Sequence, residues 1–401
     1  MIAKEVLETE SRHNRLAEVA GLFLRLGFTA FGGPAAHIAM MRREIVERRK
    51  WIDDERFVDL LSVINLIPGP NSTQLAIYLG YLRAGWPGLI VAGICFIGPA
   101  MLIVLTLAWL YVRYGSLPQA GWLFYGIKAV VIAIIAQAVW GLCRTAILKK
   151  GASPIILALL VLALYLLGIN TLILLFGGGL LYGLVRWLER RRKGEALSIV
   201  LPLFLSNQTW QFRSASPLVT LLAPAVVPVS LLTLFLTFLK IGATLYGSGY
   251  VILAFLRPDF VQGLGWLTDR QLLDAVSIGQ FTPGPVFTTA TFIGYLVAGF
   301  PGALLGTVGI FLPSFILVAI VHPLAPTLRR TPWTAAILDG VNVAAVALMG
   351  GVLFQLGQSA LIDLLTWAIA LIALIILLRF KINSAWLILA GAIIGMLRFL
   401  L

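Results

Sequence analysis

Two Pro-Gly-Pro motifs interrupt stretches of the chain that are otherwise apolar. They consist of Pro68, Gly69 and Pro70 in "NLIPGPNSTQ" and of Pro283, Gly284 and Pro285 in "QFTPGPVFTT". Glycine permits a tight turn, and proline suits the first turn of a helix because its missing N–H needs no partner there. A helix that starts after each motif presents unpaired backbone N–H groups and roughly half a positive charge. The motifs therefore predict sites that favour an anion.

Polar but uncharged side chains accompany both motifs and would add neutral hydrogen-bond donors. Those predicted to contact a ligand are Asn71, Ser72, Thr73, Thr288 and Thr289. The alternative is that each motif is a packing kink whose free backbone groups bond to a neighbouring helix. Backbone outside a helix is tolerated at membrane depth only where protein buries it or a water-filled cavity solvates it. Two related breaks therefore predict a cavity.

A second pair of breaks follows two basic residues that lie within apolar sequence. These candidate binding residues are Arg25, Gly32 and Gly33 in "FLRLGFTAFGGPAAH", and Lys240, Tyr246 and Gly247 in "FLKIGATLYGSGY". A charge inside a membrane span costs roughly 3 kcal/mol even on the most lenient scale, so it is by default a candidate for function. We expect both cations to supply charge to the ligand site. Snorkelling of the two side chains to the membrane surface is the alternative.

Membrane helices must position these motifs. Of the 401 residues, 60% are hydrophobic and 12% are charged, whereas soluble domains contain about 25% charged residues. The mean hydropathy is +0.97. Long stretches such as 86–110 carry no charge and exceed the roughly 20 apolar residues that a crossing needs. The composition predicts an all-α polytopic membrane protein with roughly ten to thirteen membrane segments, and the polar residues 1–15 do not resemble a cleavable signal peptide.

The chain repeats itself. Shifting the sequence by 215 places 51–70 over 266–285 with seven identities in 20 positions. After one residue is dropped, "GYLRAGWPG" falls on "GYLVAGFPG" with seven identities in nine. We therefore expect two homologous halves, 1–195 and 228–401, joined by a linker at 196–227.

Loop charges predict that the two halves have opposite orientations in the membrane. Basic residues of the first half gather in 42–56, 144–150 and 186–193, whereas those of the second half gather in the non-equivalent loops 329–330 and 379–381. Cytoplasmic loops attract basic residues, so the pattern is typical of an inverted repeat. The alternative is a duplication whose loop charges drifted.

The segment 57–83 has basic residues at both ends. We expect it to enter the membrane, break at Pro68 and turn back, with a full but kinked crossing as the alternative.

Few acids lie within the apolar segments. Asp59 and Asp274 are equivalent and are candidates for coupling transport to protons, although they also suit helix starts. Lys128 is a third basic candidate for ligand binding, and its counterpart in the second half is Asn342. The excess of cations over acids favours an anionic substrate rather than a metal cation.

Other functional classes find little support. The net charge of +13 arises from short loops between apolar segments, so we expect no nucleic-acid partner. The two cysteines and three histidines are scattered, and His37 is interpreted as a polar helix residue near a break. We therefore expect no metal site, cofactor or disulfide, and no catalytic motif of an enzyme.

The chain resembles the chromate ion transporter family in its long, two-half form. The resemblance rests on "FTAFGGPAAHIAMM" followed by "LIPGPNSTQLAIYLGY", and on "KIGATLYGSGY" followed by "GQFTPGPVFTTATFIGYLVAGFPGALLG". It implies efflux of chromate across the bacterial inner membrane and chromate resistance, with sulfate as a close structural analogue. It also implies that the proton motive force or the membrane potential drives transport. The second glycine motif departs from the first, so equal roles for the halves do not follow.

Together these features predict a secondary transporter that exports chromate, or a similar tetrahedral oxyanion such as sulfate, through a site between the halves. An anion channel, or a transporter of another small organic or inorganic anion, is the alternative. A membrane-embedded reductase would need a redox centre that the sequence does not suggest. The sequence leaves open whether the chain forms a homodimer.

Overall fold

The computed structural model describes residues 2–115, 117–148, 151–192, 228–246, 249–328, 332–380 and 382–400. The expected linker at 196–227 and the candidate Gly247 lie outside these residues. The described residues form helices and turns without a strand, which confirms the all-α prediction.

The first half contains seven α-helices and one π-helical turn in its described residues. They are α1 (Ile2–Thr29), α2 (Gly33–Arg42), η1 (Arg43–Arg48), α3 (Asp54–Ile64), α4 (Asn71–Tyr114), α5 (Pro118–Ala146), α6 (Ala152–Leu166) and α7 (Thr171–Arg192). The Asp53 side chain caps α3 by accepting from the backbone N–H of Arg56. Such a cap satisfies a helix-end donor that would otherwise be unpaired.

The described part of the second half repeats this order. Its elements are α8 (Leu231–Thr244), η4 (Gly249–Ile252), α9 (Leu253–Leu256), η5 (Arg257–Gly263), α10 (Asp269–Phe281), η6 (Val286–Thr288), α11 (Thr289–Leu328), α12 (Pro332–Ala360), α13 (Leu364–Arg379) and α14 (Ser384–Leu400). Thr268 forms a capping box with Gln271 at the start of α10, at the position equivalent to Asp53. In each half, the helix that leads into the Pro-Gly-Pro motif is thus capped at its start.

Helices α4 and α11 each contain a sharp turn that divides them into two arms. The turns have nearly identical backbone angles at Ala84 (φ −139°, ψ 19°) and Gly85 (φ 65°, ψ −152°), and at Ala298 (φ −143°, ψ 25°) and Gly299 (φ 63°, ψ −152°). A Cβ atom on Gly80 would lie 2.3 Å from the carbonyl oxygen of Gly88, and one on Gly294 would lie 2.2 Å from that of Gly302. These glycines let the arms touch, which explains why "GYLRAGWPG" and "GYLVAGFPG" are so alike.

Both ends of the segment around the first Pro-Gly-Pro meet at Glu18. The Trp51 indole N–H donates to Glu18 at 3.0 Å, just before α3 begins, and the Arg83 guanidinium pairs with Glu18 at 2.6 Å, where the first arm of α4 ends. The Arg83 guanidinium also lies 5.3 Å from the centre of the Trp51 ring. The chain between these residues therefore turns back, as predicted from the charges that flank it.

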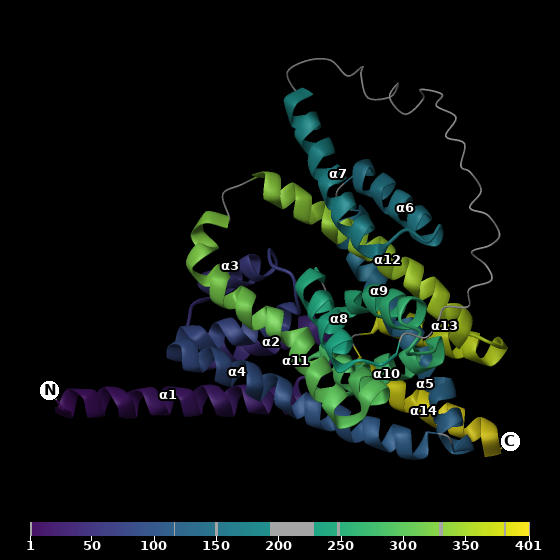
Figure 1. The fold of residues 1–401 in the computed structure, drawn as a ribbon, viewed down its shortest axis with the longest axis horizontal. Helices are drawn as coiled ribbons and strands as arrows, with labels where there is room; N and C mark the ends of the chain where they lie inside the picture. The colour runs from purple at the N-terminus through teal and green to yellow at the C-terminus, as the bar shows by residue number, and fades with distance from the viewer. Residues whose placement is uncertain are drawn as a thin grey trace.

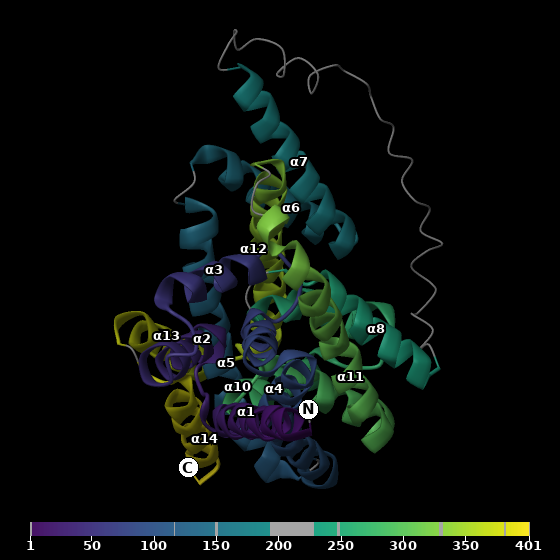
Figure 2. The same ribbon diagram turned by 90° about the vertical axis from the view of Figure 1, so that its left-hand side faces the viewer.

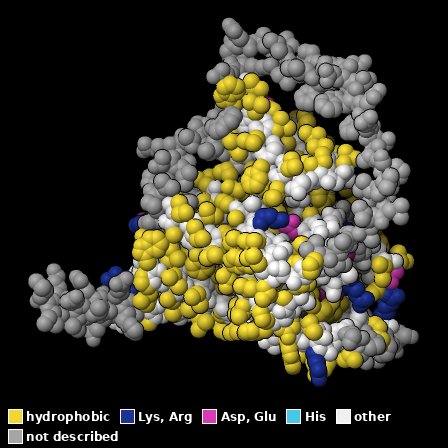
Figure 3. All heavy atoms as spheres, in the orientation of Figure 1, with side chains coloured by type: hydrophobic (Ala, Val, Ile, Leu, Met, Phe, Trp, Pro, Cys, Tyr) yellow, Lys and Arg dark blue, Asp and Glu magenta, His cyan; other side chains and the backbone are white. Residues whose placement is uncertain are grey.

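Long apolar helices and an apolar surface identify a multi-pass membrane protein. Five stretches of the described residues are long and apolar enough to span a bilayer: Asn71–Tyr114, Gly121–Ala146, Thr171–Glu189, Val286–Ile320 and Ala336–Ala360. Four shorter helices, α6, α8, α13 and α14, are also apolar. Hydrophobic side chains cover most of the described surface in Figure 3, as lipid contact requires.

The halves interlock by exchanging their last two helices. Helices α6 and α7 pack on α12 of the second half, whereas α13 and α14 pack on α5 of the first (Figures 1 and 2). A Cβ atom on Gly178 would contact Ala344, and one on Gly183 would contact Ile337. Helices α7 and α12 therefore run antiparallel. Small residues at such contacts allow close approach of membrane helices. The exchange joins both halves into one body around the central breaks.

Candidate functional site

The two Pro-Gly-Pro turns are each anchored on the opposite half. The Gly69 N–H donates to the carbonyl oxygen of Leu245 at 2.6 Å, and the Gly284 N–H donates to that of Ala30 at 2.8 Å. Both acceptors follow directly on the first helix of their half. The glycines have φ values of 124° and 87°, which favour glycine strongly. The predicted tight turns are therefore confirmed, and the four predicted breaks form one central assembly.

A helix N-terminus is exposed to the interior of this assembly at the first motif. Helix α4 begins at Asn71 directly after Pro70, and no side chain caps it. The hydroxyl of Thr73 and the hydroxyl of Ser314 on α11 are buried and have no hydrogen-bond partner. Unpaired N–H groups and hydroxyls at the positive end of a helix form a suitable environment for an anion.

A cavity of about 470 Å³ opens beside this N-terminus, between the two halves. Its polar lining comes from both halves: Asn65, Asn71 and Thr145 from the first, and Tyr246 and Asn342 from the second. The structure thus brings together two of the predicted site residues, Asn71 and Tyr246. None of the described side chains that line this cavity is charged, so the polarity of this lining comes from neutral groups and backbone.

His37 connects the first glycine break to the start of α4. Its Nε2 lies 3.0 Å from the Ala30 carbonyl oxygen, and its Nδ1 lies 3.4 Å from the Ser72 hydroxyl. Since a carbonyl only accepts, Nε2–H donates to it, and in the neutral ring Nδ1 accepts from Ser72. Gly32 and Gly33 start α2 with φ values of 101° and 78°. His37 is therefore a polar helix residue near a break, as interpreted from the sequence.

The second motif differs from the first. A short 3₁₀ turn, η6, follows Pro285 before α11 begins. The Thr288 hydroxyl donates to the Pro285 carbonyl oxygen, and the Thr289 hydroxyl donates to that of Val286, both at 2.8 Å. Because these two donors are engaged by backbone, the halves do not offer equal ligand groups in this conformation.

The two cations predicted to supply charge are each paired with an acid. Arg25 pairs with Glu44 at 2.6 Å, and Lys240 pairs with Asp259 at 2.6 Å. Glu44 and Asp259 are related by the same shift of 215 that relates the cations, so the ion pair itself is repeated. Neither acid is among the site residues predicted from the sequence, although the shift of 215 relates the two acids to each other as it relates the two cations. Neither cation lines the cavity beside α4, and their contact with substrate stays a prediction.

Glu44 accepts from several arginines at once. Arg48 and Arg49 donate to it in addition to Arg25. Burial raises the pKa of the Glu44 carboxyl, but the hydrogen bonds from Arg49 and Arg25 outweigh this effect and hold the pKa below its usual value. The carboxylate is therefore charged at neutral pH and holds Arg25 in place.

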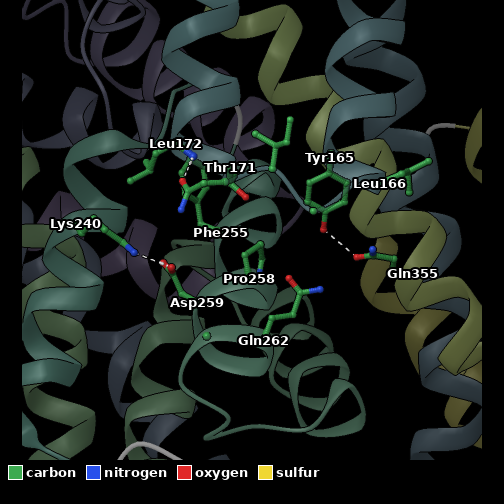
Figure 4. Close-up of a pocket in the computed structure, with 14 residues that line it drawn as sticks. Tyr165, Leu166, Thr171, Leu172, Lys240, Phe255, Pro258, Asp259, Gln262 and Gln355 are labelled. Carbon is green, nitrogen blue, oxygen red and sulfur yellow. Dashed lines mark hydrogen bonds and ion pairs between the residues drawn. The ribbon is translucent and has the colours of Figure 1, made fainter. Parts of the chain in front are cut away.

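Lys240 lies at a second cavity of about 440 Å³. Figure 4 shows the Lys240 ammonium directed at Asp259, and the hydrogen-bonded pair of Tyr165 and Gln355 at the other side of the view. The Tyr165 hydroxyl donates to Gln355 at 2.8 Å. The loop between α6 and α7 completes the lining. This cavity is separate from the α4 N-terminus and has a paired charge at its edge.

Lys128 and Asp274 form an ion pair that links the halves. Their charged atoms lie 2.9 Å apart, with 11% and 2% of the side chains exposed. The Tyr111 hydroxyl donates to the other Asp274 oxygen at 2.8 Å.

Asp59, the equivalent of Asp274, is exposed. Helix α3 is capped by Asp53 and α10 by Thr268, whereas Asp59 and Asp274 lie inside these helices. The interpretation of Asp59 and Asp274 as helix starts is therefore wrong.

Among the described residues, no group of three or more His, Cys, Asp and Glu side chains could hold a metal ion. Cys95 and Cys143 are free.

Comparison with known proteins identifies the family. The family model described as "Chromate transporter" matches residues 17–184 and 232–396, one match in each half. A probable chromate transport protein of Synechococcus elongatus is 35% identical over 374 residues, covering 90% of this chain and 89% of its own. A chromate transport protein of Cupriavidus metallidurans is 34% identical over 389 residues, covering 96% and 93%. No solved structure matches the chain. The two-part match and the identity over nearly the full length show that the chain belongs to the chromate transporter family, whose members are transporters and not enzymes.

Proposed function

We propose that the protein is a secondary transporter that exports chromate, or a similar tetrahedral oxyanion such as sulfate, from the cytoplasm and so confers chromate resistance. The observation that carries the proposal is the cavity of about 470 Å³ at the uncapped N-terminus of α4, between the two halves. The similarity to the probable chromate transport protein of Synechococcus and to the chromate transport protein of Cupriavidus supports chromate as the substrate.

The lining of this cavity suits a transported anion. Backbone N–H groups at the start of α4 supply partial positive charge, and the unpartnered Thr73 hydroxyl in the first turn of this helix supplies a donor. The described lining residues include no fixed cation, so a dianion would be held moderately and could be released on the far side. Arg25, Lys128 and Lys240 would act electrostatically from outside the cavity in this conformation.

Loop charge supports a cavity that opens toward the cytoplasm. Thr145 lines the cavity in the last turn of α5, next to the basic residue Arg144. Basic loops favour the cytoplasm, so the cavity would face the cytoplasm of a bacterial inner membrane. The antiparallel packing of α7 on α12 supports oppositely oriented halves. Rocking of one half against the other would then open the opposite side.

Coupling to protons or to the membrane potential would drive export. Of the two coupling candidates, the buried Asp274 is better placed than the exposed Asp59, because Asp274 belongs to the second half and contacts Lys128 and Tyr111 of the first. The cavity is complete within one chain, so the proposal does not require a homodimer.

A flux experiment separates the transporter from a channel or from a carrier of another anion. Purified protein in liposomes loaded with unlabelled chromate should accumulate labelled chromate by exchange, with saturable initial rates and inhibition by sulfate. A conductance that rises linearly with chromate concentration, without exchange, would establish a channel instead. Exchange of another anion but not chromate would reassign the substrate.

A further inference from the structure

The Lys128–Asp274 pair occupies the place that corresponds to the open cavity in the other half. Asn342 lines the open cavity, and its counterpart in the first half is Lys128. An inverted repeat that alternates between two states has two such cavities, of which one is closed at a time. Lys128 therefore marks the closed counterpart.

The exposure of equivalent residues shows the same difference. Asn65 lines the open cavity and is exposed, whereas its counterpart Gln280 is 8% exposed. Ile38 also lines the open cavity and is half-buried, whereas its counterpart Leu253 is 1% exposed. Side chains fill the counterpart space in this conformation.

Three helices meet at the pair. Lys128 comes from α5 and Tyr111 from α4, both in the first half, while Asp274 comes from α10 in the second half. Helix α10 is the one that leads into the second Pro-Gly-Pro turn. Opening the counterpart cavity requires α10 to separate from α5, and this movement must break the 2.9 Å ion pair and the 2.8 Å hydrogen bond.

We propose that Lys128, Asp274 and Tyr111 form the gate of a second, outward-facing cavity at the second Pro-Gly-Pro motif. The closed gate stabilises the cytoplasm-facing state. The equivalent positions at the first motif differ, because Asn342 stands where Lys128 would be, and Asp59 is exposed where Asp274 is buried. The inference rests on the proposed alternation between two open states, but its test needs no substrate.

Thiol labelling in oriented membrane vesicles tests the gate. Single cysteines are placed at Asn65 and, separately, at Gln280 in a chain whose Cys95 and Cys143 are replaced by alanine. In the parent, a membrane-impermeant reagent should label Asn65→Cys from the cytoplasmic side and leave Gln280→Cys protected. Adding Asp274→Asn leaves the Lys128 charge unpaired in the closed state, so labelling of Gln280→Cys from the opposite side should rise at least severalfold.

Two further variants keep the test decisive. The double substitution Lys128→Asn with Asp274→Asn removes the attraction without leaving a buried charge, and it should also raise labelling of Gln280→Cys. Asp59→Asn is the matched control and should leave labelling as in the parent. Continued protection of Gln280→Cys in the double variant, with Asn65→Cys labelled as in the parent, would overturn the gate. Because no chromate is present, this result is independent of the substrate.

Discussion

The backbone N–H of Gly69 donates to the carbonyl oxygen of Leu245 at 2.6 Å, although the two residues belong to different halves of the chain. Gly284 repeats this bond to Ala30 at 2.8 Å. Each Pro-Gly-Pro turn is therefore fixed by the break that follows the first helix of the other half. A hydrogen bond of this kind satisfies a buried backbone donor that would otherwise be costly, and it couples the positions of the halves.

Gly69→Ala should disturb this centre. With φ at 124°, an alanine is strained by about 1–3 kcal/mol, and its Cβ would lie 2.4 Å from the Gln74 amide nitrogen. We expect lower thermal stability of the detergent-purified protein and weaker chromate transport. Gly98→Ala is the control, because it has no strained φ and no neighbour within 4 Å. Equal stability of the two variants would show that the turn does not need glycine.

Thr73→Val and Thr289→Val should differ although both remove a hydroxyl. The Thr73 hydroxyl is buried in the first turn of α4 without a partner, whereas the Thr289 hydroxyl already donates to the carbonyl oxygen of Val286. A lost hydrogen bond to a charged ligand costs about 2 kcal/mol, which corresponds to roughly thirtyfold in affinity. The KM for chromate in vesicles should therefore rise strongly in Thr73→Val and little in Thr289→Val. The opposite order would move the anion to the second motif.

Lys240→Gln and Arg25→Gln should each weaken transport while the protein still inserts into the membrane. Their pairs with Asp259 and Glu44 are partly exposed, so each should contribute no more than about 1 kcal/mol to stability. Transport rate and membrane content are measured side by side. Unchanged transport in both variants would remove these cations from the mechanism and leave the ion pairs as structural contacts.

The exchanged helices provide a test of the fold. A Cβ on Gly179 would lie 2.5 Å from a Val341 methyl group, whereas Gly177 on the same helix has no neighbour within 4 Å. Gly179→Val should separate α7 from α12 and reduce the monodisperse fraction in size-exclusion chromatography. Gly177→Val should elute as the parent does. Similar profiles for both variants would contradict the packing of α7 on the second half.

The repeat allowed the central architecture to be predicted. The shift of 215 placed both turns and both glycine breaks in register, and the flanking charges predicted that the segment around Pro68 turns back. The same shift relates the Arg25–Glu44 pair to the Lys240–Asp259 pair, but both acids lie outside the apolar segments. The apolar segments alone therefore contain the cations without their partners.

Contacts between the halves could not be predicted from one sequence. The pairing of Lys128 with Asp274 depends on how α5 and α10 pack, and hydrophobic pattern does not specify a neighbour. For the same reason, the packing of α6 and α7 on the second half and of α13 and α14 on the first could not be predicted. The neutral character of the cavity beside α4 also depends on which side chains point inward, whereas the sequence shows only that cations are nearby.

Uptake of radiolabelled chromate into everted membrane vesicles tests the central claim most directly. Vesicles that contain the protein should accumulate chromate when energised, and an uncoupler or excess sulfate should reduce this accumulation. At equal protein content and a chromate concentration below the KM of the parent, vesicles with Thr73→Val should accumulate less chromate than vesicles with the parent. Equal accumulation in vesicles with and without the protein would contradict chromate export.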